Sequence, residues 1–148
     1  MVGYGPEDDH FVVELTYNYG IHSYEVGSHF VGFELCSKTV YKSVFASSHK
    51  ATDDQLVVRD PNGYSIFVKD ATREDPFSKV ILNVSELKKS LVFWHDILNM
   101  TIVSRSATNA VLSYGPEQCP LEIRHGNVGR GSGFGRIAFA CPSSEVNP

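Results

Sequence analysis

The chain has 148 residues, of which 13 are basic and 17 acidic, so its net charge at pH 7 is −4. This balance argues against a nucleic-acid partner, because phosphate binding requires clustered Lys and Arg. Hydrophobic residues make up 42% of the chain and aromatic residues 11%, enough for a packed core, and no apolar window approaches the ~18 residues of a membrane span. The three cysteines are scattered, which indicates reduced thiols in a cytoplasmic protein, with the mitochondrion as the alternative; they are Cys36, Cys119 and Cys141.

The first half of the chain predicts strands over residues 10–17 and 29–36. A short helix is expected over 38–46, after Ser37. Residues 55–59 and 64–69 form a predicted hairpin. Its turn has the sequence Asp-Pro-Asn-Gly, in which Pro and Gly favour turn dihedral angles.

The second half predicts a strand over residues 79–84 and then the clearest helix of the chain, over 86–99. Its apolar residues recur at helical spacing and Ser85 is its expected N-cap; they are Leu87, Leu91, Trp94 and Leu98. Strands are expected to follow at 100–105, 109–114, 120–125 and 135–141. The segment from 79 to 125 therefore predicts one complete β-α-β-β-β unit.

An ordered series of segments recurs along the chain. The tetrapeptide Tyr-Gly-Pro-Glu occurs at 4–7 and at 114–117, and each copy precedes a strand-like run with a central glutamate, Glu14 or Glu122. This pattern predicts an α+β fold of tandem βαβββ modules, truncated at both ends. The expected parts are the last strands of a first module (1–26), a divergent second module (27–72), a complete third module (77–126) and the first strand of a fourth (133–148). Because both ends fall inside a unit, we expect a fragment of a longer protein.

Several short motifs resemble those of glyoxalase I. Residues 13–20 (VELTYNYG) resemble its LELTHNWG motif, residues 60–64 (DPNGY) its DPDGY hairpin, and residues 87–91 (LKKSL) with Met100 its helix signature. The chain thus resembles the vicinal oxygen chelate superfamily, of which glyoxalase I is the best-known member. The resemblance implies a divalent metal, zinc or nickel, and an activity toward hemithioacetals of glutathione.

In that superfamily the first and last strands of each unit each offer one metal ligand from the concave face of the sheet. The resemblance makes Glu14 and Glu122 candidate catalytic carboxylates, and Glu14 and His29 candidate metal ligands. Glu14 has the alternative of being satisfied by a neighbouring cation or tyrosine. For His29, strand alternation through residues 32–35 predicts that Phe30 occupies the ligand position, so only a bulge would return His29 to the concave face.

The remaining ligand positions fall on residues that cannot coordinate a metal, namely Phe67, Lys79 and Arg136. Lys79, Arg136 and Glu122 are instead expected to form a charge network in place of a metal. Asn18 matches the family's peptide-contacting asparagine, and Arg130 lies near a family arginine position. The candidate substrate-binding residues are therefore Asn18, Lys79, Arg130 and Arg136.

Two functions follow from these expectations. The preferred hypothesis is a degenerate glyoxalase-domain scaffold that binds a small molecule or a protein, without a cofactor and without a full metal site. The alternative is a metal-dependent lactoylglutathione lyase-like enzyme with zinc or nickel. In either case we expect modules to pair within a longer chain or a dimer.

Overall fold

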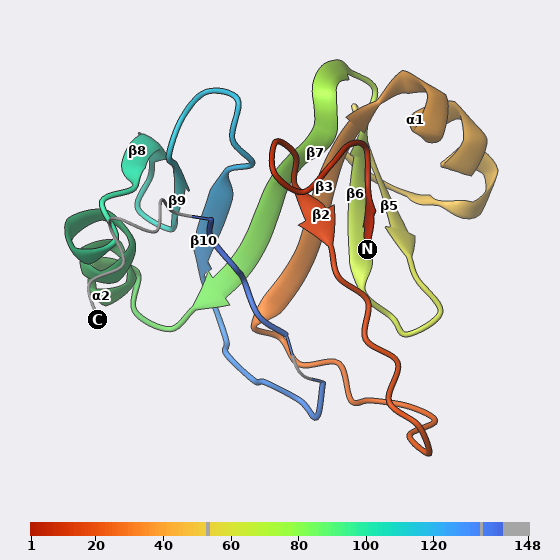
Figure 1. Ribbon diagram of the computed structural model, residues 1–148, viewed down its shortest axis with the longest axis horizontal. Coiled ribbons are helices and arrows are strands. Elements are labelled where there is room, and N and C mark those ends of the chain that lie inside the picture. The colour runs from red at the N-terminus through yellow and green to blue at the C-terminus, as the bar shows by residue number, and fades with distance from the viewer. Residues whose placement is uncertain (53, 134, 141–148) are drawn as a thin grey trace.

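A computed structural model describes residues 1–52, 54–133 and 135–140, and its main feature is one eight-stranded mixed sheet (Figure 1). The strand order is β4-β5-β6-β3-β7-β10-β9-β8. The strands are β3 (Phe30–Ser37), β4 (His49–Thr52), β5 (Gln55–Arg59), β6 (Ser65–Lys69), β7 (Thr72–Val84), β8 (Thr101–Arg105), β9 (Asn109–Ser113) and β10 (Leu121–His125). Two short helical segments accompany this sheet, so the predicted α+β fold class is confirmed.

The sheet has two similar halves that meet at its centre. Strands β3 and β7 pair antiparallel there, and each pairs in parallel on its other side, β3 with β6 and β7 with β10. Each half has one helical segment after its first strand. These are α1 (Lys38–Val44), which continues as η1 (Phe45–Ser47), and α2 (Leu87–Leu91), which continues as the π-helical turn η2 (Val92–Ile97). The four strands at the centre are therefore the first and last strands of the two halves.

The helix starts follow local capping chemistry only in part. Ser37 is the N-cap of α1, and its Oγ accepts a hydrogen bond from Val40 N at 3.3 Å. The expected cap at Ser85 is wrong, because the N-cap of α2 is Glu86 and it makes no capping bond with its side chain. Packing of Leu91 against the sheet holds this helix in place instead.

The core lies between α2 and one face of the sheet. Alternation along β7 sends Val80, Leu82 and Val84 to this face, and the strands β9 and β10 add further buried side chains; those added are Ala110, Leu112, Leu121 and Ile123. The opposite face of the same strands carries Lys79 on β7 and Glu122 on β10. We call this opposite face the inner face.

The strand expected over 10–17 is largely absent. Only β2 (Val12–Val13) forms, paired with β1 (Val2–Gly3) in a separate two-stranded sheet. Phe11 anchors this piece on the core side, with its ring 5.1 Å from that of Phe77. From residue 14 to 25 the chain runs away from the main sheet without strand structure (Figure 1). A strand needs a neighbouring edge for its hydrogen bonds, and this segment lies beside none.

The strand expected over 135–141 is also not formed over 135–140, and residue 141 lies outside the described residues. Phe139 packs instead against Trp94 and Tyr114, with ring centroids 5.9 and 5.7 Å apart. Phe139 stays 43% exposed, so these aromatic contacts cover its ring only in part. No helix in the described residues has the length and apolar character needed to cross a membrane.

Candidate functional site: a charged cluster on the inner face

A β-bulge at Ser78 sets the geometry of the inner face. Glu34 on β3 pairs with Lys79 on β7, whereas the next residue, Leu35, pairs with Phe77, so Ser78 and Lys79 together oppose Glu34. Both side chains contact its carboxylate: Ser78 Oγ donates to Oε1 at 3.0 Å, and Lys79 Nζ lies 3.6 Å from Oε2. The bulge thus brings a hydroxyl and an ammonium to one buried acid.

Lys79 also contacts a second carboxylate. Its Nζ donates to Glu122 Oε2 at 2.8 Å, and Arg124 Nε donates to Glu122 Oε1 at 2.6 Å. The ion pair expected between Lys79 and Glu122 is therefore present. A single ammonium joins Glu34 of β3 to Glu122 of β10 across β7.

Both acids are almost fully buried, with 4% of Glu34 and 5% of Glu122 exposed. Burial of an unpaired carboxylate is costly, so each needs several partners. Glu34 Oε2 accepts a hydrogen bond from Gln55 Nε2 at 2.9 Å and has Lys69 Nζ at 3.5 Å. The strands β5, β6, β7 and β10 thus all contribute to one connected cluster.

The side chain of Arg124 on β10 lies near that of Phe67, although their strands are not neighbours in the sheet. Its guanidinium carbon lies 6.0 Å from the ring centroid of Phe67 on β6. Strands β6 and β10 are separated by β3 and β7, and three strand spacings of ~4.8 Å would keep them far apart on a flat sheet. The two side chains therefore reach toward each other across the two intervening strands.

The cluster changes the acidity of Glu122. Burial raises the pKa of this carboxyl, but hydrogen bonds from Arg124 and Lys79, together with their positive charges, outweigh burial and lower the pKa below its ordinary value. Glu122 is therefore ionised at neutral pH and acts as an acceptor for both cations.

The donors present do not fit a metal ion. In the position between the two carboxylates stands the ammonium of Lys79, which has no lone pair while it is protonated. Phe67, at the last strand of the first half, offers no donor atom. Among the described residues no group of three or more His, Cys, Asp or Glu side chains is placed to hold a metal.

Sequence reasoning missed Glu34, the second acid of the site, and four residues that bind the two acids, namely Gln55, Lys69, Ser78 and Arg124. Glu34 stands between Phe33 and Leu35 in an apolar strand, and a glutamate in a strand interior requires a partner. A glutamate inside an apolar strand is a visible signal in the sequence, and it indicates a functional role for Glu34 as strongly as for Glu14.

His29 illustrates a second effect of backbone irregularity. Phe30 pairs with Leu82 and Gly32 with Ile81, so Val31 is an extra residue in β3. Phe30 therefore shares the core face with Phe33, at a ring distance of 4.9 Å, and the assignment of Phe30 to the inner face is wrong. Alternation from Phe30 puts His29 on the opposite side of the backbone, and its backbone carbonyl accepts a hydrogen bond from Asn83 N at 2.7 Å.

The cluster contacts given above involve none of the other candidates. Glu14 is exposed in the irregular segment after β2, and Asn18, also exposed, donates a hydrogen bond to the hydroxyl of Tyr24. Arg130 and Arg136 are exposed and lie outside the named strands. Of the residues predicted for the site, the structure brings together Lys79 and Glu122, and it adds Glu34.

Comparison with known proteins supports the fold that the sequence motifs predict. Residues 86–148 match the family model described as glyoxalase domain-containing protein 4-like, C-terminal domain. The chain is 39% identical over 151 residues to Glyoxalase 1 of Caenorhabditis briggsae, covering all of this chain and 54% of that protein. It is 41% identical over 155 residues to glyoxalase domain-containing protein 4 of Rattus norvegicus, covering 99% of this chain and 52% of that protein.

Among solved structures, glyoxalase I from Zea mays superimposes with a TM-score of 0.75 at 27% identity, covering 88% of this chain and 56% of that one. The chain is thus a glyoxalase-domain protein of the vicinal oxygen chelate type. Within this class it is similar to the glyoxalase domain-containing protein 4 group. It spans about half the length of the curated relatives it matches.

Proposed function

We propose that this chain is a binding scaffold of the glyoxalase type, in which an ion-pair cluster stands in place of the metal centre. The observation that carries the proposal is the ammonium of Lys79, which lies 3.6 Å from Glu34 and 2.8 Å from Glu122. A metal ion between these carboxylates would have to displace that ammonium, and the two positive charges would then repel each other at short distance. Such a competition disfavours metal binding.

The ligand of the scaffold is a small molecule or a protein. The cluster carries the cations Lys69, Lys79 and Arg124 against two carboxylates, and the side chains of Lys69 and Arg124 are 34% and 38% exposed. These two exposed cations favour a ligand with an anionic group. Asn18, Arg130 and Arg136 remain candidate contacts contributed by the surrounding segments.

The alternative is a metal-dependent lyase acting on glutathione hemithioacetals. It is supported by the similarity to glyoxalase I from Zea mays. The bulge at Val31 is the kind of irregularity that this function would need to turn His29 toward the inner face. This function would use Glu14, Glu122 and His29 with zinc or nickel. It would require Lys79 to leave the position between the carboxylates.

Metal content decides between the two functions. The chain is purified without chelators, supplied with zinc and nickel in turn, desalted, and analysed by inductively coupled plasma mass spectrometry together with turnover of the methylglyoxal–glutathione adduct. The scaffold proposal expects far less than one equivalent of metal and no turnover. About one equivalent of metal that is lost in both Glu14→Gln and Glu122→Gln, with turnover in the unsubstituted chain, would establish the lyase.

We further place the protein in the cytoplasm or the mitochondrion, and propose that its modules pair within a longer chain or a dimer. Pairing is favoured by the apolar side chains that the irregular segment after β2 exposes; these are Leu15, Tyr17, Tyr19 and Ile21.

A further inference from the structure

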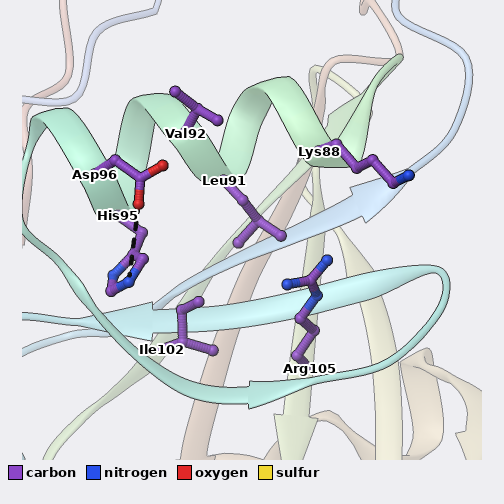
Figure 2. Close-up of a pocket in the computed structure, with 7 residues that line it drawn as sticks. All are labelled: Lys88, Leu91, Val92, His95, Asp96, Ile102 and Arg105. Carbon is purple, nitrogen blue, oxygen red and sulfur yellow. Dashed lines mark ion pairs between the residues drawn. The ribbon is translucent and has the colours of Figure 1, made fainter.

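A hollow lies on the core side of the sheet, opposite the inner face, between the helical segment α2–η2 and the edge strand β8 (Figure 2). Its volume is about 180 Å³. The residues that line it are Lys88, Leu91, Val92, His95, Asp96, Ile102 and Arg105. None of them belongs to the charged cluster of the inner face. We call this hollow the helix–strand groove.

Two cations stand at one end of the groove. Lys88 comes from α2 and Arg105 from the end of β8, and Figure 2 shows the guanidinium of Arg105 directed toward the helix. Within the described parts of the chain, neither is joined to a carboxylate. The neighbouring Lys89 differs, since its Nζ binds Glu86 at 2.8 Å. The groove thus holds two positive charges without an internal partner, in a chain of net charge −4.

The floor of the groove is apolar. Leu91 is 6% exposed, and Figure 2 shows Leu91 and Ile102 facing each other between helix and strand. Two cations beside an aliphatic floor match a ligand with an anionic group on an apolar body.

His95 supplies a defined polar atom at the other end. Its Nδ1 lies 2.7 Å from the carbonyl oxygen of Met100. A carbonyl only accepts hydrogen bonds, so Nδ1 carries a proton and the neutral ring keeps Nε2 as an acceptor. Asp96 Oδ1 is 3.9 Å from Nε2, too far for a hydrogen bond. A hydroxyl or N–H group on the ligand has a partner there.

The irregular backbone of β8 makes a small molecule a better ligand for this region than an added peptide strand. Although β8 is at the edge of the sheet, its pairing with β9 is interrupted by a bulge between Ile102 and Ser104. A bulge in an edge strand disturbs the regular row of backbone groups that an added strand would use. We propose that the helix–strand groove binds a small organic carboxylate, with its anionic group between Lys88 and Arg105 and its apolar body on Leu91 and Ile102.

The test is a titration of the isotope-labelled chain with benzoate and with 4-hydroxybenzoate, followed by amide chemical shifts. We expect saturable shifts confined to the residues around the groove, at millimolar concentration. Tighter binding of the hydroxylated probe is expected through His95, and loss of this advantage in His95→Phe is the check on that contact. Benzyl alcohol, which lacks the carboxylate, is expected to produce none of these shifts.

Matched variants distinguish binding in the groove from unspecific attraction of anions to surface cations. Lys88→Gln and Arg105→Gln each weaken benzoate binding about threefold, and together about tenfold, as expected for exposed ion pairs. Lys89→Gln makes the same charge change one residue away and is expected to leave the affinity unchanged. Equal weakening by Lys89→Gln, equal shifts with inorganic phosphate, or no saturable shift with any probe would overturn the proposal. Melting curves of the three single variants and of the double variant verify that each remains folded.

Discussion

The carboxylates of Glu34 and Glu122 lie on different strands, and the ammonium of Lys79 connects them from the strand between, at 3.6 and 2.8 Å. Both acids are nearly inaccessible to water. Their charges are tolerated because this cation and its neighbours balance them. The cluster therefore links the two halves of the sheet as well as defining the candidate site.

Replacement of the central cation is expected to destabilise the fold. Lys79→Met leaves two buried carboxylates with one partner fewer, and we expect the free energy of unfolding to fall by about 3 kcal/mol or more. Urea denaturation measures it. Lys89→Met is the control, since its ion pair with Glu86 is exposed and is expected to contribute about 0.5 kcal/mol or less. Equal losses in the two variants would mean that the cluster contributes no more than a surface pair.

The cluster also predicts the pH dependence of stability. The pKa of Glu122 is lower in the folded chain than its ordinary value, so the folded state binds fewer protons on this group than the unfolded state. Its stabilisation is fully present above the ordinary glutamate pKa and is lost as the pH falls through the lower, folded value. Unfolding measured between pH 7 and pH 3 is expected to show a shallower decline in Glu122→Gln. A parallel pair of curves would exclude Glu122 as a contributor to acid sensitivity.

Substitution of Lys79 by a metal-binding side chain is expected to create a metal site. In Lys79→His an imidazole replaces the ammonium near the carboxylates of Glu34 and Glu122, and zinc accepts this set of nitrogen and oxygen donors. We expect about one equivalent of zinc after desalting, and a rise in melting temperature when zinc is added. Lys79→Met gives the matching change without a donor. Zinc bound equally by both variants would place the metal elsewhere.

Gly32 is expected to be intolerant of a side chain. It has φ +151°, and a Cβ there would lie 2.1 Å from the carbonyl oxygen of Ser65 on β6. Gly32→Ala is therefore expected to lower the stability by about 2 kcal/mol or more, or to shift the bulge beside it. Gly135→Ala is the control, since among the described residues no atom beyond its chain neighbours lies within 4 Å of the added Cβ. Thermal unfolding and the amide shifts of His29 measure the two effects.

Cys119 is expected to be unreactive in the folded chain. Burial raises the pKa of its thiol to about 12, against a smaller opposite effect from Arg73, and the reactive thiolate is therefore rare at neutral pH. Mass spectrometry after iodoacetamide at pH 8 is expected to find Cys119 unmodified in buffer and modified in urea. Rapid labelling in buffer would show that this region opens readily.

The sequence alone predicted most of the elements between residues 30 and 125 in their correct order, because hydrophobic periodicity and turn residues are local signals. It missed the edge strand β4 (His49–Thr52). It also identified Lys79 and Glu122 as partners on the concave side of the sheet. The family motifs supplied the class of fold.

Only the tertiary structure decided how the site is assembled. The bulges at Val31 and Ser78 shift which side chains share a face, and no local pattern marks their positions. They place Phe30 in the core and bring Ser78 and Lys79 together against Glu34. The segment around Glu14 matched a strand motif but lies beside no sheet edge, so its hydrogen bonds could not form. A strand and its inward face are determined by the neighbours with which it pairs, and those neighbours lie far away in the sequence.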